Sequence, residues 1–80
     1  MTNDEDSLIL IAFGAHLKEI REGRKIRLGK KISLRELEVL TEIDYSQIHR
    51  IEKGVTAPSL LTLKALAKGL QISLVELVDF

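Results

Sequence analysis

The chain has 80 residues, no cysteine, and 12 basic against 12 acidic side chains, so its formal net charge is zero. This length fits one domain over residues 1–80, and the lack of cysteine excludes disulfide frameworks and thiolate zinc sites. Hydrophobic residues make up 45% of the chain but aromatic residues only 4%. The predicted fold class is therefore all-α, a compact helical bundle with an aliphatic core.

The first residues of the chain argue against secretion and against a membrane span. Asp4, Glu5 and Asp6 are acidic where a secretion signal would be basic, and residues 1–6 are expected to form a disordered acidic N-terminus. The apolar run at residues 8–13 is far shorter than the roughly 20 residues that a membrane helix needs. We therefore expect a soluble cytoplasmic protein with no membrane partner.

Residue types that carry catalysis are sparse. The two histidines, His16 and His49, are too few and too far apart in sequence to suggest a metal site. The chain also lacks a cysteine nucleophile, a glycine-rich phosphate loop and any reason to pair carboxylates across a cleft. We expect no enzyme, no metal, no cofactor and no small-molecule ligand.

The charges are distributed unevenly along this neutral chain. Only Glu19 and Glu22 offset the bases between residues 18 and 35, which are Lys18, Arg21, Arg24, Lys25, Arg27, Lys30, Lys31 and Arg35. Such a field can attract a polyanion locally although the whole molecule is neutral. The alternative for this feature alone is an ordinary solvated run of basic side chains.

Five helices are predicted, and the first two lie in the N-terminal half of the chain. The first covers residues 7–24, with apolar side chains at helical spacing: Leu10, Phe13, Leu17 and Ile20. The second covers residues 34–41. It begins after Ser33, which with Glu36 has the spacing of a capping box, in which each side chain bonds to the other residue's backbone N–H.

The third predicted helix covers residues 45–53. Asp44 and Gln47 have the spacing of a second capping box, and Gly54 is a natural left-handed stop. So few residues separate this helix from the preceding one that the two must cross at a steep angle. This is the helix-turn-helix arrangement, and it turns the outer face of the third helix away from the bundle.

The last two helices are short and rich in leucine. Ser59 can cap a fourth helix over residues 60–70, which buries Leu63, Leu66, Ala67 and Leu70. A further capping box, Ser73 with Glu76, opens a fifth helix over residues 74–78. No segment shows the alternation of a strand, and there is no internal repeat.

The third helix divides into an apolar and a polar face. Ile48 and Ile51 point together into the bundle, joined by Ile43 from the turn. The opposite face carries Tyr45, Ser46, His49, Arg50 and Lys53. Arginine can fork onto guanine, serine can bond a base or a phosphate, and a tyrosine ring suits a thymine methyl. The alternative is an ordinary hydrated helix face.

Several segments carry a family resemblance that covers most of the chain. They are "FGAHLKEIRE", "SLREL", "SQIHRIEKG", "APSLLTLKALAKGL" and "ISLVELVDF". In these segments the chain resembles the Cro/C1-type helix-turn-helix domain, the XRE family of phage repressors and small bacterial regulators. The resemblance implies a lambda-repressor-like five-helix bundle. It also implies sequence-specific binding of double-stranded DNA by a transcriptional regulator, as a repressor, with the third helix in the major groove.

The resemblance assigns roles to individual residues. It implies base-facing positions at Tyr45, Ser46, His49 and Arg50, and a phosphate-facing position at Lys53. We also expect phosphate contacts from Arg21, Lys30, Lys31 and Ser33. The resemblance implies that Glu52 bonds inside the protein and that Asp44 caps the third helix. The chain also departs from the family's pattern, with Leu34, Glu38 and Glu42 where relatives usually have Gln, Ala and Gly. The extra basic segment 24–31 is either a lengthened first helix or a basic loop at the edge of the DNA face.

The C-terminal segment predicts a partner as well. A helix over residues 74–78 cannot turn all its apolar side chains inward, and an exposed apolar patch commonly marks an interface. We expect a homodimer on a palindromic operator through Leu74, Leu77, Val78 and Phe80. The alternative function is an antitoxin-like or other helical protein-interaction module in which DNA binding is secondary.

Overall fold

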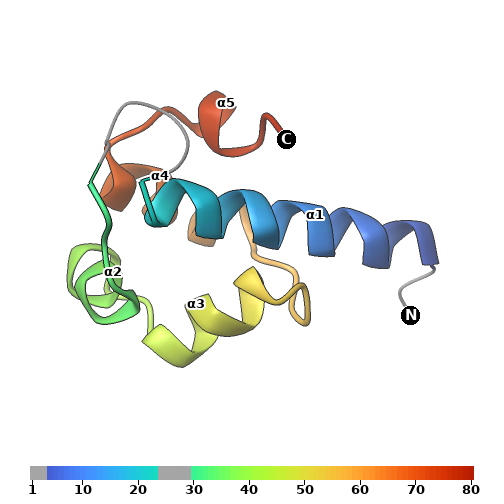
Figure 1. The fold of residues 1–80 in the computed structure, drawn as a ribbon, viewed down its shortest axis with the longest axis horizontal. Coiled ribbons are helices and arrows are strands. Elements are labelled where there is room, and N and C mark those ends of the chain that lie inside the picture. The colour runs from blue at the N-terminus through green and yellow to red at the C-terminus, as the bar shows by residue number, and fades with distance from the viewer. Residues whose placement is uncertain (1–3, 24–29) are drawn as a thin grey trace.

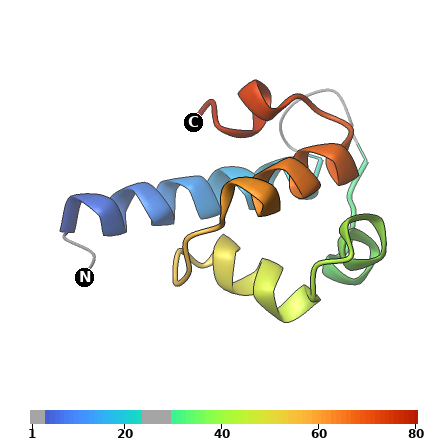
Figure 2. The ribbon, with the colours of Figure 1, turned by 180° about the vertical axis from the view of Figure 1, so that it is seen from behind.

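The computed structural model describes residues 4–23 and 30–80, and this part of the chain forms five α-helices and no strand (Figure 1). The helices are α1 (Asp4–Arg21), α2 (Leu34–Thr41), α3 (Tyr45–Glu52), α4 (Leu60–Leu70) and α5 (Leu74–Leu77). The bounds predicted for α2 and α4 are confirmed, while α3 and α5 end one residue earlier than predicted. The views from front and back both place α3 and α5 on opposite sides of α1 (Figures 1 and 2).

Helix α1 is displaced toward the N-terminus relative to the prediction, and Asp4–Asp6 are helical rather than part of a disordered tail. Three carboxylates in the first turn interact favourably with the positive end of the helix dipole. The helix ends at Arg21 because Gly23 adopts a left-handed φ of +75° and its N–H donates to the Ile20 carbonyl. The two predicted placements of the segment 24–31 largely concern residues 24–29, which lie outside the described part.

Apart from Phe13, the core is aliphatic, and it draws on every helix. Its completely buried large side chains are Leu17, Ile20, Leu37, Ile48, Ile51, Leu66, Leu70 and Leu77. Three residues predicted to face inward, Leu10, Ile43 and Leu63, are only half-buried. Helix α1 crosses α3 closely at Gly14, where an added Cβ would lie 2.5 Å from the Ile51 carbonyl oxygen. A side chain at this position would push α3 away from α1.

Two of the three predicted capping boxes are present. Ser33 with Glu36 and Ser73 with Glu76 each make both reciprocal hydrogen bonds. The box predicted at Asp44 and Gln47 is wrong, because the Gln47 N–H donates to the backbone carbonyl of Asp44 at 3.0 Å. The Asp44 carboxylate accepts instead from the N–H of Ser46 at 2.8 Å.

The turn between α2 and α3 accommodates two of the departures from the family's pattern. Glu42 occupies the left-handed region with φ 61°, where a residue other than glycine costs on the order of 1 kcal/mol. Glu38 reaches across the turn, and its carboxylate accepts a 3.2 Å hydrogen bond from the N–H of Tyr45. This contact ties the last turn of α2 to the start of α3, which an alanine at the position of Glu38 could not do.

Candidate nucleic-acid interface

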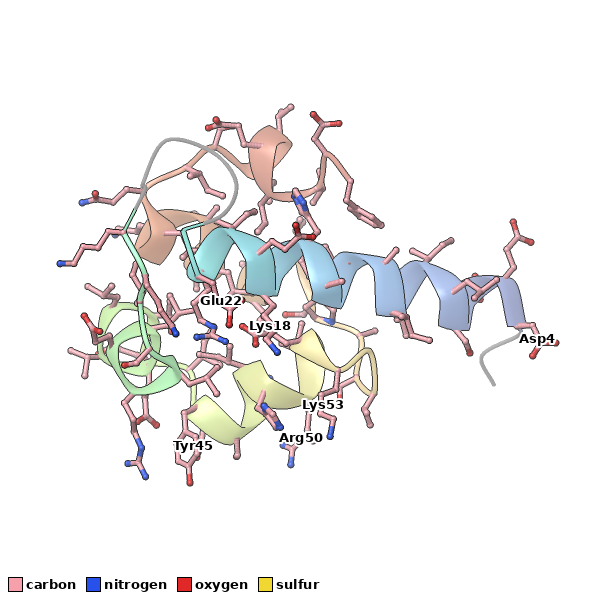
Figure 3. All side chains as sticks on the ribbon, viewed as in Figure 1. Asp4, Lys18, Glu22, Tyr45, Arg50 and Lys53 are labelled. Atoms are coloured by element: carbon pink, nitrogen blue, oxygen red, sulfur yellow. The ribbon has the colours of Figure 1, made fainter. Side chains whose placement is uncertain are left out.

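Helix α3 presents a polar face on the side away from α1. Tyr45, Arg50 and Lys53 all project from that side (Figure 3) and are exposed. Ile48 and Ile51 are 0% and 1% exposed and form the back of the helix. The predicted division of α3 into an outer polar and an inner apolar face is therefore confirmed.

Hydrogen bonds organise the first turn of α3. The Ser46 hydroxyl donates to the Asp44 carboxylate at 2.7 Å, in addition to the backbone bond from the N–H of Ser46. These two bonds, and to a lesser degree the charges of Arg50 and Arg35, lower the pKa of Asp44 below its ordinary value. Asp44 is therefore ionised at neutral pH. The oxygen of the Ser46 hydroxyl keeps lone pairs that can accept from a base.

Arg35 belongs to this surface, although no sequence pattern assigned it there. Its guanidinium carbon lies 4.1 Å from the centroid of the Tyr45 ring, a cation–π geometry that restrains the ring and brings a positive charge beside the head of α3. The sequence contains Arg35 only as one member of a basic run. Its contact with Tyr45 depends on how α2 crosses α3, which helical periodicity does not specify.

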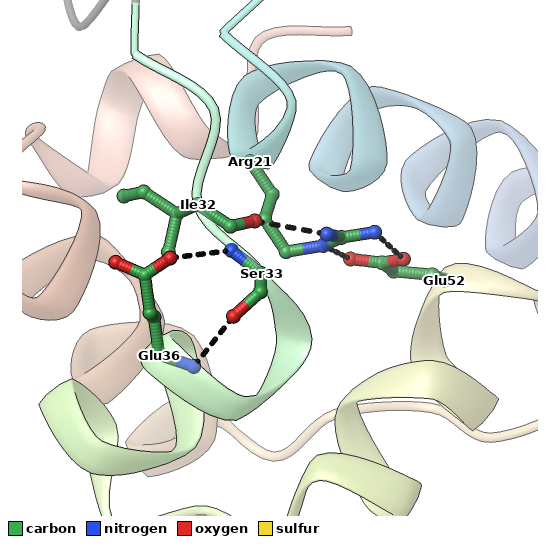
Figure 4. Close-up of polar contacts among 5 residues, drawn as sticks. All are labelled: Arg21, Ile32, Ser33, Glu36 and Glu52. Atoms are coloured by element: carbon green, nitrogen blue, oxygen red, sulfur yellow. Dashed lines mark hydrogen bonds and ion pairs between the residues drawn. The ribbon is translucent and has the colours of Figure 1, made fainter.

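Arg21, predicted to contact phosphate, lies instead in the interior (Figure 4). Its Nε and Nη2 donate to the two carboxylate oxygens of Glu52 at 2.6 and 3.0 Å, and its Nη1 donates to the Ile32 carbonyl at 2.9 Å. Arg21 is 6% exposed and Glu52 8%. The prediction for Arg21 is wrong because a buried guanidinium paired with a carboxylate cannot reach DNA. The inward role of Glu52 is confirmed.

The ion pair also organises the chain that enters α2. The N–H of Ile32 donates to the Arg21 carbonyl at 2.8 Å, so the chain returns to the end of α1 at Ile32. Side chains alternate across an extended segment. Lys31 and Ser33 therefore lie on one side of this segment, and Lys30 and Ile32 on the other.

A surface hollow of about 420 Å³ lies on the Lys31 side, between the end of α1, the start of α2 and the end of α3. We call it the lysine hollow; it is lined by Lys18, Arg21, Glu22, Lys31, Ser33, Leu34, His49, Glu52 and Lys53. It brings together four of the five residues predicted to face phosphate, Arg21, Lys31, Ser33 and Lys53, although Arg21 lies in its floor. It also includes His49, which the sequence had assigned to the bases. Lys18 was not assigned to the site.

Lys30 is separated from the lysine hollow. It lines a different hollow of about 380 Å³, together with Val39, Leu40 and Gly69 of α2 and α4. The two neighbouring lysines, predicted to act together, therefore lie in different surroundings.

Of the residues predicted for a dimer interface, one is buried and three are exposed. Leu77 is 0% exposed and belongs to the core, so its prediction as an interface residue is wrong: in the single turn of α5 it is the completely buried side chain. Leu74, Val78 and Phe80 are 38%, 43% and 51% exposed. With Val75 they form what we call the C-terminal apolar patch. Phe80 also packs edge-on against Phe13 of α1, with ring centroids 5.6 Å apart.

Residues 4–23 and 30–80 contain no group of three or more histidine or acidic side chains that could hold a metal ion. No helix in these ranges is long and apolar enough to cross a membrane.

Comparison with known proteins identifies the family. A family model described as Helix-turn-helix matches residues 24–77. Among the curated proteins, none matches this sequence. Among solved structures, the chain is similar to the restriction-modification controller protein C.AhdI from Aeromonas hydrophila, with 31% sequence identity and a TM-score of 0.74, over 85% of this chain and 94% of that one. The chain thus belongs to the Cro/C1-type helix-turn-helix family of DNA-binding transcriptional regulators, which is not a class of enzymes.

Proposed function

We propose that this regulator binds a palindromic DNA operator as a homodimer and represses transcription by occupying a promoter. The observation that carries the proposal is the outer face of α3, where Tyr45, Ser46 and Arg50 stand together on a helix whose back is buried in the core. A helix of this kind fits the major groove and presents hydrogen-bonding groups to base edges.

Each side chain of that face has a defined chemical role in the proposal. Arg50 donates two parallel hydrogen bonds to the O6 and N7 of a guanine. Tyr45, held under the guanidinium of Arg35, places its ring against a thymine methyl and its hydroxyl near a phosphate. Ser46 bonds a base at the head of the helix. Lys53, at the end of α3, and Ser33, at the start of α2, face the phosphate backbone on either side of the groove.

The proposed dimer rests on the C-terminal apolar patch. One unit reads only a few base pairs, whereas two units set about 34 Å apart read two half-sites one turn of DNA apart. Leu74, Val78 and Phe80 expose apolar surface that a second copy can cover. Helices α5 and α3 lie on opposite sides of α1 (Figures 1 and 2), so pairing through the patch leaves α3 open to DNA.

The choice of promoters to test follows from the comparison. C.AhdI is named as a controller of restriction and modification, so promoters of restriction-modification genes are the first candidates for control. The proposed place of action is the cytoplasm, where these promoters lie.

Selection of bound sites from a random double-stranded DNA pool tests the proposal. The expected result is a recovered motif with two-fold symmetry and a half-site spacing of about one helical turn. An enriched site without two-fold symmetry would overturn the dimer but would still support sequence-specific binding of DNA. If no sequence is enriched and retention on DNA disappears at modest salt, the α3 surface does not read bases, and the protein-interaction alternative takes its place.

A further inference from the structure

The lysine hollow has a construction that the base-reading face does not share. Its lysines come from three elements: Lys18 from α1, Lys31 from the chain entering α2, and Lys53 from the end of α3. All three side chains are exposed. The tertiary fold therefore collects around one small volume three cations that are far apart in the sequence.

The charge balance of the hollow is positive. Arg21 and Glu52 cancel each other in the buried ion pair. The remaining charges of the lining are three lysines against the single carboxylate of Glu22, an excess of two positive charges with His49 neutral. A concave site whose charges are mostly of one sign attracts ions of the opposite sign.

Backbone donors add to this field from the start of α2, a helix of eight residues. The capping box uses the N–H groups of Ser33 and Glu36. The first N–H groups of a helix point out of its end, and those of Leu34 and Arg35 lie between the two that the box uses. Ser33 and Leu34 both line the hollow. Leu34 can therefore supply through its backbone the anion contact that its side chain cannot.

We propose that the lysine hollow binds one phosphate group of the DNA backbone, with Lys18 and Lys31 as its ligands and Lys53 at its outer edge. The inference rests on the proposed DNA-binding function and deepens it by naming a phosphate-binding residue, Lys18, that the sequence did not assign. The phosphate lies beside the end of α1 and fixes how α3 enters the groove. The floor of the site is the Arg21–Glu52 pair, which holds α1, α3 and Ile32 in place.

The same geometry excludes Lys30 from the contact. Lys30 is next to Lys31 in sequence but lines the hollow on the other side of the extended segment. Lys30→Ala is therefore a matched control for Lys31→Ala, with the same charge removed one residue away.

The experiment replaces backbone phosphates of the selected operator, one position at a time, with neutral methylphosphonate. With the wild-type protein, one position in each half-site should weaken binding by about eightfold at 0.1 M salt, the effect of one lost phosphate contact. With the Lys18→Ala/Lys31→Ala variant, the same replacement should not weaken operator binding any further. With Lys30→Ala, it should weaken operator binding as much as in the wild type. Circular dichroism checks that each variant is folded.

The salt dependence gives a second readout. The double variant should lower the slope of log K against log salt by about 1.8, because each protomer of the proposed dimer loses one phosphate contact worth about 0.9, and it should weaken binding to specific and random DNA alike. Lys30→Ala should leave the slope unchanged. Glu22→Gln, which removes the opposing carboxylate, should tighten binding to all sequences.

The outcomes distinguish this inference from the function on which it rests. If the wild type selects an operator and Arg50→Ala loses that selectivity, but the lysine variants show no coupling to any phosphate, the inference alone is overturned. If Lys18 and Lys31 couple to two different phosphates, the single site is also overturned. A wild-type protein that binds no DNA would overturn both. Saturation of the hollow by millimolar inorganic phosphate, with unchanged operator affinity, would identify it as a site for unattached anions and overturn the inference.

Discussion

The outer face of α3 and the C-terminal apolar patch are both exposed, but they are built in different ways. Around α3, polar groups are restrained by contacts within the protein. Asp44 bonds Ser46, Arg35 covers the ring of Tyr45, and beneath them Arg21 is paired with Glu52. On α5 and directly after it, Val75 and Val78 are 74% and 43% exposed and offer apolar surface.

This difference indicates which kind of ligand each surface takes. Restrained charges and donors suit a polyanion, and their attraction weakens as salt screens it. Apolar side chains suit another protein surface, and salts such as sulfate strengthen their burial. Sulfate should therefore weaken DNA binding by a monomeric variant while it strengthens self-association of the wild type. The predictions that follow alter one surface at a time.

The largest effect is expected when acidic side chains are introduced into the C-terminal apolar patch. Leu74→Glu with Val78→Glu should give a folded monomer whose affinity for the full operator falls by about 10²- to 10⁴-fold, because the second half-site no longer adds to the first. Sedimentation and fluorescence anisotropy measure the two effects. Val39→Glu is the matched control, since Val39 is 78% exposed on α2, away from the patch. A wild type that sediments as a monomer at high concentration and binds a full palindrome one-to-one would contradict the dimer.

Breaking the support beneath α3 should have the next largest effect. Glu52→Ala leaves the Arg21 guanidinium buried without its partner, and the free energy of unfolding should fall by about 3–5 kcal/mol. The change is measured by urea denaturation followed by circular dichroism. Arg21→Met with Glu52→Leu removes both charges and should recover most of the lost stability. Equal destabilisation of the single and the double variant would show that the geometry of the pair, rather than an unpaired charge, decides the stability.

Removing one base-reading side chain should have a smaller effect, confined to binding. Arg50→Ala should cost about 1–3 kcal/mol of binding free energy on the selected operator and relax the preference at one base pair. Folding should be unchanged because the side chain is exposed and points away from Ile48 and Ile51. Lys53→Ala is the control and should weaken binding to all DNA sequences alike. If Arg50→Ala weakens specific and random DNA equally, Arg50 contacts a phosphate rather than a base.

The smallest effect concerns the cap of α3 and its dependence on pH. The pKa of Asp44 is lowered in the folded protein from its ordinary value of 3.8, so the ionised carboxylate stabilises the fold above that value. This stabilisation should disappear as the pH falls through the lowered pKa. Thermal melting of the wild type and of Asp44→Asn should therefore differ by a constant amount above about pH 5 and converge in stronger acid. A difference that persists unchanged at the lowest pH would show that the Asp44 charge does not contribute.

The sequence alone determined what depends on neighbours within a few positions. The serine caps Ser33 and Ser59, the stop at Gly54 and the spacing of Ile48 and Ile51 all act within one or two helical turns. Their consequences, the helices α2 to α4 and the two faces of α3, are confirmed in the structure. Local hydrogen bonds and periodic burial are sufficient physical reasons for these features.

Only the tertiary structure decided what each long or apolar side chain meets across the bundle. Arg21 has the sequence surroundings of a surface base, yet it is buried because Glu52 lies 31 positions later on a crossing helix. Leu77 faces the core, while Leu74, one turn earlier, is 38% exposed, because α5 packs only one side against α4 and the core. Lys30 and Lys31 diverge because the chain is pinned at Ile32 and extended around it. These outcomes follow from contacts between distant segments, which the spacing of residues along one helix does not encode.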